Sequence, residues 1–248
     1  MMVVDLDLVY EKIERFMENN YRELMKTGTL LLLEFPISDI NGFLLENGIE
    51  CLGEFRGRGV INYTEPHCIF EGKKVIGLHI RETQTEPSVN VYVEGEEDLF
   101  IGKLTDAIAS FIITFNRTFF EAFVRGFLSD EDSVILTGYN DPKAFAIAIL
   151  SLSGGKMDID YRYIDVGKFY TMKIPKSELV DTTYDTLFLK AVGKDVIAVP
   201  ISREEVFRLI MSEHENLKAE LMKNLATNVE LQKLIDKILE EVEQEEKS

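Results

Sequence analysis

Apolar residues recur along the chain with two different periods, and each change of period marks another predicted element. From residue 6 to residue 25 the apolar positions keep a helical spacing, which predicts a helix that Gly28 ends. Residues 29–35 form a continuous apolar run, which predicts a buried strand. A short helix through residue 45 follows, and Ser38 is its expected N-cap.

The rest of the first half is rich in short strands. Its apolar runs predict strands near residues 49–55, 59–63, 67–71, 74–81 and 89–93. Gly72-Lys73 is expected to make a two-residue hairpin turn, because glycine supplies the positive φ that such a turn needs. Residues 99–115 predict a buried helix, since Lys103 and Asp106 interrupt an apolar run that is too short to span a bilayer.

The second half repeats this order of elements. A helix is predicted at 118–128, then a strand at 134–136, then a helix that begins at Asp141-Pro142 and ends at Gly154-Gly155. Further strands are predicted near residues 157–164, 168–174, 186–192 and 195–199. The expected fold class is therefore α+β, with two similar helix/antiparallel-sheet units at residues 1–117 and 118–226. Their similar order makes internal duplication a hypothesis, although no repeat is visible residue by residue.

The C-terminal arm, residues 203–248, carries the clearest local signals. Two capping boxes, Ser202-x-x-Glu205 and Thr227-x-x-Glu230, each predict the start of a helix. A stripe of apolar side chains at spacings of three and four follows each box. The first stripe is Phe207, Ile210, His214, Leu217 and Leu221, and the second is Leu231, Ile235, Ile238 and Val242.

Two interpretations of this arm remain open. Asn224 and Asn228 stand where a continuous stripe would need apolar residues, which favours two helices with a break near residues 226–227. The alternative is one long coiled-coil helix whose buried asparagines set the register. With two helices, residues 227–248 form an acidic helical tail.

Composition narrows the partners and the compartment that this fold could have. The chain has 248 residues, of which 46% are hydrophobic, and a formal net charge of −17. That charge repels phosphate backbones and disfavours nucleic acid as a partner. Two cysteines are too few for a disulfide scaffold, and no basic segment precedes an apolar run at the N-terminus. We therefore expect a cytoplasmic protein with free thiols and no membrane contact, whose abundant Glu and Lys are typical of thermophile proteins.

The side chains that could bind zinc gather in one segment, at Cys51, His67, Cys68 and His79. Their spacing argues against a shared metal, because adjacent strand residues such as His67 and Cys68 point to opposite faces. In the hairpin register expected from Gly72-Lys73, Cys68 and His79 share one face, so these two are the weak metal candidates. That face is apolar, which is typical of a buried cysteine and a hydrogen-bonded histidine, and we expect no metal.

Three further motifs have ordinary structural explanations. Arg56 and Arg58 stand among glycines and could contact phosphate, but a solvated turn is the favoured interpretation. Residues 153–156 hold a Gly-Gly-Lys sequence without the other residues of a Walker loop, so a helix C-cap explains the glycines. Asp158 and Asp160 would share one strand face, but no third ligand can be named. No catalytic residue and no cofactor is assigned.

The leading hypothesis is a non-enzymatic interaction or regulatory module. It would use the amphipathic C-terminal helices to associate with itself or to dock on a protein partner. The reason is that the apolar stripes of these helices are longer than packing against a single α+β body requires. The alternative is a small-ligand-binding protein or an enzyme, with a pocket between sheet and helix. A second alternative is a nucleic-acid-binding regulator, since duplicated sheet-and-helix units occur in saddle-shaped DNA binders.

Overall fold

The computed structural model describes residues 5–33, 37–56, 61–63, 65–82, 86–156, 158–225 and 229–245. The chain divides into two compact units. The first unit consists of Asp5–Phe115 together with Ala219–Ser248, and the second unit is Asn116–Lys218. As expected, the fold class is α+β with C-terminal helices. The two sheets are mixed rather than antiparallel as predicted, because each contains one parallel pair of strands. No helix within the described ranges is long and apolar enough to cross a membrane.

The first unit holds a six-stranded sheet and the helices around it. Its elements are α1 (Leu6–Thr27), β1 (Leu30–Leu33), α2 (Ile40–Glu46), β2 (Ile49–Leu52), β3 (Ile61–Tyr63), β4 (His67–Phe70), β5 (Lys73–Glu82), β6 (Pro87–Val93), α3 (Glu97–Phe115) and α7 (Val229–Glu245). The strand order is β2-β4-β5-β1-β3, with β6 paired to β5. β1 lies parallel to β5 and antiparallel to β3.

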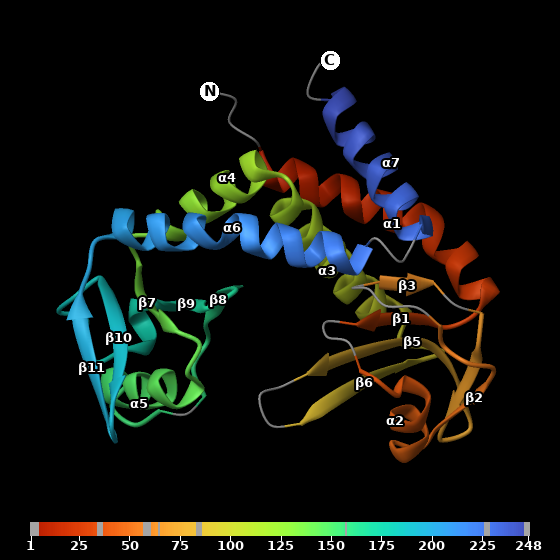
Figure 1. Ribbon diagram of the computed structural model, residues 1–248, viewed down its shortest axis with the longest axis horizontal. Coiled ribbons are helices and arrows are strands. Elements are labelled where there is room, and N and C mark those ends of the chain that lie inside the picture. The colour runs from red at the N-terminus through yellow and green to blue at the C-terminus, as the bar shows by residue number, and fades with distance from the viewer. Residues whose placement is uncertain are drawn as a thin grey trace. The chain divides into compact units, whose positions relative to one another are not determined.

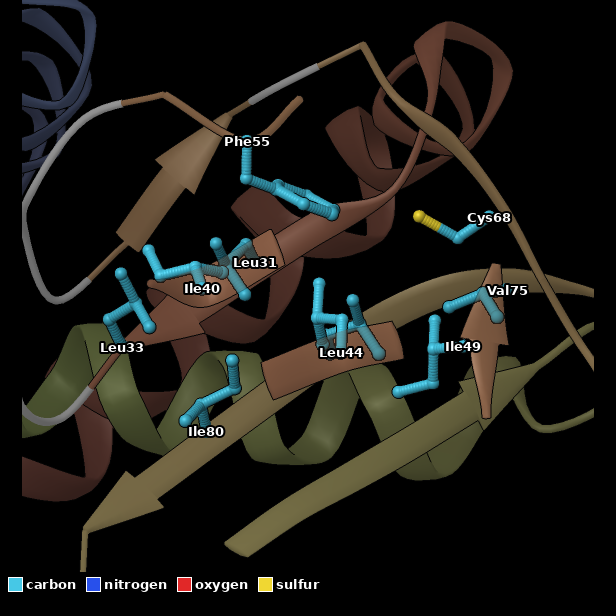
Figure 2. Close-up of a cluster of buried hydrophobic side chains, with 10 residues drawn as sticks. Leu31, Leu33, Ile40, Leu44, Ile49, Phe55, Cys68, Val75 and Ile80 are labelled. Atoms are coloured by element: carbon cyan, nitrogen blue, oxygen red, sulfur yellow. The ribbon is translucent and has the colours of Figure 1, made fainter. Parts of the chain in front are cut away.

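The core of the first unit follows from the alternation of side chains across this sheet. On one face, Leu31 and Leu33 of β1 and Leu78 and Ile80 of β5 form a buried cluster with Leu44 of α2. Figure 2 shows Leu31, Leu33, Ile80 and Leu44 in this cluster. On the other face α3 approaches closely. A Cβ atom added at Gly77 of β5 would lie 2.0 Å from the Phe100 ring of α3, so only glycine permits this packing.

The second unit holds a five-stranded sheet between helices (Figure 1). Its elements are α4 (Arg117–Leu128), β7 (Ser133–Tyr139), α5 (Pro142–Leu152), β8 (Arg162–Val166), β9 (Phe169–Pro175), a short 3₁₀ turn (Lys176–Glu178), β10 (Thr186–Val192), β11 (Asp195–Pro200) and most of α6 (Arg203–Leu225). The strand order is β11-β10-β7-β9-β8. α5 covers the face that carries Leu136, Met172 and Leu187, while α4 and α6 lie over the opposite face.

The two sheets share a pattern of strand pairing. In each unit the first strand (β1 or β7) is parallel to one neighbour (β5 or β10) and antiparallel to the other (β3 or β9). The parallel neighbour pairs antiparallel with the strand that follows it (β6 or β11). A helix follows the first strand in both units, and another follows the last strand. The common order is what an internal duplication would produce, and that duplication stays a hypothesis.

Several local predictions are confirmed and others are wrong. Asp141 caps α5, because its side chain accepts hydrogen bonds from two amide N–H groups of the first turn. The cap of α2 is Asp39 rather than Ser38, since the Asp39 carboxylate accepts the Gly42 N–H at 2.9 Å. The β4–β5 turn is Glu71-Gly72 rather than Gly72-Lys73, with both residues at positive φ as a type I′ turn requires.

Candidate functional site

The first capping box of the C-terminal arm forms as predicted. The Ser202 N–H donates to a Glu205 carboxylate oxygen at 2.9 Å, and the Glu205 N–H donates to the Ser202 hydroxyl at 3.2 Å. Two helices, α6 and α7, follow in this part of the chain, as favoured over one continuous helix. The second box begins at Thr227, which lies outside the described residues.

Most of the apolar stripe of α6 packs within the second unit. Ile210 and His214 are buried, and the His214 ring lies 4.8 Å from the Phe120 ring of α4 between centroids. Phe207 is half-buried beneath the Arg125 guanidinium, which lies 3.9 Å from its ring centroid. Further along the helix, Leu217 and Leu221 are half-buried.

The stripe of α7 is placed within the first unit. Ile235 and Ile238 are buried, and α7 packs against α1 and β3. The Lys237 ammonium lies 5.2 Å from the centroid of the Phe16 ring of α1. The side chains of Leu231 and Val242 lie outside what the structure describes. The buried members of both stripes therefore pack within the units themselves.

Polar contacts also fasten α6 to the second unit. Arg203 donates hydrogen bonds to the backbone carbonyls of Leu128, Asp130 and Ser133. Farther along α6, the nearly buried carboxylate of Glu213 lies 2.7 Å from the Lys168 ammonium. The hydrogen bond from Lys168 holds the pKa of Glu213 below its ordinary value. These contacts hold α6 against the rest of the second unit.

The expectation of free thiols is wrong, because Cys51 and Cys68 form a disulfide. They face each other directly across the β2–β4 pair, with Cα atoms 4.0 Å apart. The expectation that Cys68 shares a face with His79 is also wrong. The register of β5 shifts between Val75 and Gly77, and this bulge turns His79 to the face opposite Cys68 and Val75.

The remaining motifs of the sequence do not converge in the structure. Within the described ranges, no group of three or more His, Cys, Asp or Glu side chains could hold a metal ion. Arg56 lies 3.8 Å from Glu54 in an exposed ion pair, and Arg58 lies outside the described residues. Gly154 and Gly155 adopt positive φ after α5, as a helix C-cap requires. Asp158 and Asp160 precede β8 and share no strand face, in contrast to the prediction.

An open cavity of about 560 Å³ lies in the first unit, between α1 and the start of α3. Tyr21, Arg22, Met25 and Lys26 line one side, and Gly95, Glu96, Glu97, Asp98 and Leu99 line the other. The N–H of Gly95 donates to the Glu97 carboxylate at 3.0 Å, which lowers the pKa of Glu97. The carboxylates at the start of α3 thus occupy the helix end that would otherwise attract an anion.

The second unit exposes an apolar surface on its sheet. We call it the open face, and it consists of Tyr139, Phe188, Val192, Ile197 and Val199, all on the side of β7, β10 and β11 that is opposite α5. Tyr139 is 56% exposed, and Ile197 and Val199 are each nearly half exposed. The Tyr139 ring meets the Phe188 ring edge-on, with centroids 6.0 Å apart, so the aromatic part is held in a fixed geometry.

The open face ends at β11, which pairs with β10 and forms one edge of the sheet. From residue 196 to residue 200 this edge strand reads Val-Ile-Ala-Val-Pro, with no charged side chain. Edge strands in monomeric proteins are usually protected by charges, bulges or short length. β11 has a charge only at its first residue, Asp195, and a proline at its last, so both its edge and its face are suited to contact with another chain.

The sequence could not identify the open face. The segment from Thr186 to Pro200 was predicted as two strands, but apolar residues stand on both of their faces. Periodicity therefore gives no indication of which face is covered. The useful signal is the uncharged run at residues 196–200 in a strand that ends a sheet, and this can be used only when the strand order is known.

The chain matches no protein-family model, no curated protein and no solved structure.

Proposed function

We propose that the chain is a non-enzymatic protein-binding module whose contact surface is the open face of the second unit. The observation that carries this proposal is the set of exposed apolar side chains on β7, β10 and β11. Exposed apolar side chains gathered on one sheet face are typical of protein interaction sites, because burying them releases water at little conformational cost.

A comparison with the first unit supports the proposal. β6 holds the place in the first sheet that β11 holds in the second. On the face that corresponds to the open face, β6 carries the polar residues Ser88 and Asn90, where β11 carries Ile197 and Val199. Polar residues on a solvent-exposed sheet face are the ordinary arrangement. The apolar residues of β11 are thus not a requirement of this topology.

Charge separates this proposal from binding to nucleic acid. Lys190 of β10, opposite Ile197, and Asp195 of β11, opposite Val192, lie on the same side of the sheet as the open face, so this side has no excess of positive charge. Phosphate backbones are bound mainly through clustered Lys and Arg side chains. A protein surface with apolar character fits the open face better.

Photo-crosslinking in the native host tests the proposal. A photoreactive phenylalanine analogue is placed at Phe188 of the open face, and a matched control carries it at Tyr184, an exposed aromatic residue in the loop before β10. We expect a discrete protein adduct, identified by peptide sequencing, from position 188 and not from position 184. Equal labelling at both positions, or no adduct at position 188, contradicts the proposal.

A further inference from the structure

We infer that the partner at the open face is a second copy of this chain, joined through β11 to β11 across a two-fold axis. This inference rests on the proposed function and names its partner. The two five-stranded sheets would join through an antiparallel β11–β11 pair into one continuous mixed sheet, with the open faces of both copies adjoining on the same side.

The direction of the backbone groups in β11 allows this pairing. The Ile201 N–H donates to the Thr186 carbonyl at the start of β10. Because successive strand residues point their N–H and C=O groups to opposite sides, the groups of Val199 and Ile197 also point to β10. The groups of Val196 and Ala198, and the carbonyl of Pro200, therefore point outward and are available to another strand.

The position of Pro200 agrees with this assignment. Proline has no N–H, and on an edge strand it costs nothing where the missing donor would have pointed outward. Pro200 occupies such an outward position, so its pairing with Leu187 of β10 loses no bond. The edge thus keeps two outward N–H groups, from Val196 and Ala198, and three outward carbonyls, from Val196, Ala198 and Pro200.

The side chains of β11 are self-complementary in one register. With the two-fold axis at Ala198, each Ile197 lies opposite Val199 of the other copy, and each Val196 lies opposite Pro200. Residues on the open face then meet only residues of the open face, as a continuous sheet requires. All paired residues are apolar, and a β-branched pair such as Ile197 with Val199 stabilises a sheet.

Charge also favours this edge as the place where two copies meet. A second copy carries the same net charge of −17, so most of the two surfaces repel each other. The β10–β11 turn and β11 together, residues 192–200, hold one lysine, Lys194, and one aspartate, Asp195. In the proposed register both lie beyond the paired segment, so two copies meet here without like charges in contact.

Sedimentation velocity of the full chain over a range of concentrations tests the inference. We expect the wild type to form a dimer in a concentration-dependent way. Val199→Lys should raise the dimer dissociation constant about 100-fold or more, since it places a lysine opposite Ile197 in each of two symmetric pairs. Val180→Lys is the matched control, because Val180 is 73% exposed in a loop of the same unit and should leave the constant unchanged.

Hydrogen–deuterium exchange of the wild type supplies a readout that needs no variant. The amides of Val196 and Ala198 should become protected as the dimer forms. A chain that stays monomeric, a dimer that Val199→Lys does not weaken, or a dimer with protection elsewhere would each overturn the inference. A crosslink from position 188 to a different protein, with the chain monomeric, overturns the second copy as partner and keeps the proposed function.

Discussion

The two units share one pattern of strand pairing but differ in how the faces of their sheets are covered. In the first, α2 covers one face and α3 approaches the other so closely that Gly77 touches the Phe100 ring. In the second, α5 covers one face, while part of the other remains exposed as the open face. Strand order therefore fixes where the core lies. It leaves the character of the edge and of the outer surface to individual residues.

The units also differ in how their loops are held. The first has a covalent link between β2 and β4, through Cys51 and Cys68. The second contains no cysteine and relies on ion pairs and on side chains that donate to backbone carbonyls. Each unit should therefore be sensitive to a treatment that the other tolerates.

The largest effect is expected from Gly77→Ala, which tests the close approach of α3 in the first unit. The added Cβ would lie 2.0 Å from the Phe100 ring, so α3 must move or the strand must distort. We expect the first unit to lose about 3 kcal/mol or more of its free energy of unfolding, as overpacked cores do. Hydrogen–deuterium exchange by peptide measures this loss separately in each unit.

The control for this change is Gly102→Ala in α3. No atom lies within 4 Å of a Cβ added there, and alanine favours a helix over glycine. Gly102→Ala should stabilise the first unit by up to about 1 kcal/mol. A first unit in which both alanines are tolerated alike would show that the contact between β5 and α3 is loose.

Reduction of the disulfide is the next test and is confined to the first unit. The link joins residues 17 apart in sequence, and opening a loop of this size costs about 3 kcal/mol through the entropy of the unfolded chain. We expect dithiothreitol, or the double change Cys51→Ala with Cys68→Ala, to weaken exchange protection in the first unit. The second unit should be unaffected, and equal loss in both would contradict the comparison.

Arg203 provides the corresponding test for the second unit. Its guanidinium donates to three backbone carbonyls that lie between the end of α4 and the start of β7. Arg203→Ala leaves these carbonyls without that donor and should cost the second unit about 2 kcal/mol in unfolding free energy. Urea titration followed by peptide-resolved exchange measures the change.

Arg208→Ala is the matched control in the same helix. Arg208 and Glu204 form an exposed pair with 3.6 Å between nitrogen and oxygen. Exposed pairs of this spacing contribute about 0.3–0.5 kcal/mol. A cost at Arg208 as large as that at Arg203 would mean that charge, rather than the bonds to carbonyls, anchors α6.

These elements also show where reasoning from the sequence succeeds. The caps at Asp141 and Ser202 were predictable because each depends on a side chain within three residues of its target. The order of helices and strands followed from periodicity for the same local reason. The fold class was therefore accessible from short segments alone.

What could not be predicted depends on contacts between distant segments. The disulfide requires that β2 and β4 pair with Cys51 opposite Cys68, and no local pattern fixes that register. The face of His79 depends on one bulge residue in β5. The open face depends on which strand ends the sheet. Each of these is a property of pairing, which an apolar run does not reveal.

The smallest effect is expected from acidification, and it should weaken the second unit more than the first. Hydrogen bonds lower the pKa of Glu205 through Ser202, of Glu213 through Lys168 and of Asp185 through Lys176. The pKa values of Asp130, Asp181 and Glu215 are lowered too, whereas among the described carboxylates of the first unit only Glu97 shows this direction.

The direction of this pH effect on stability follows from the linkage between protonation and folding. A carboxyl group whose folded pKa lies below its unfolded value of about 4 stabilises the fold above that value. This contribution is lost as the pH falls through the folded pKa. Between neutral pH and about pH 3 the second unit should therefore lose more exchange protection than the first. Glu213→Gln should remove one part of this pH dependence, and an equal acid response in both units would show that the ion pairs of the second unit contribute little.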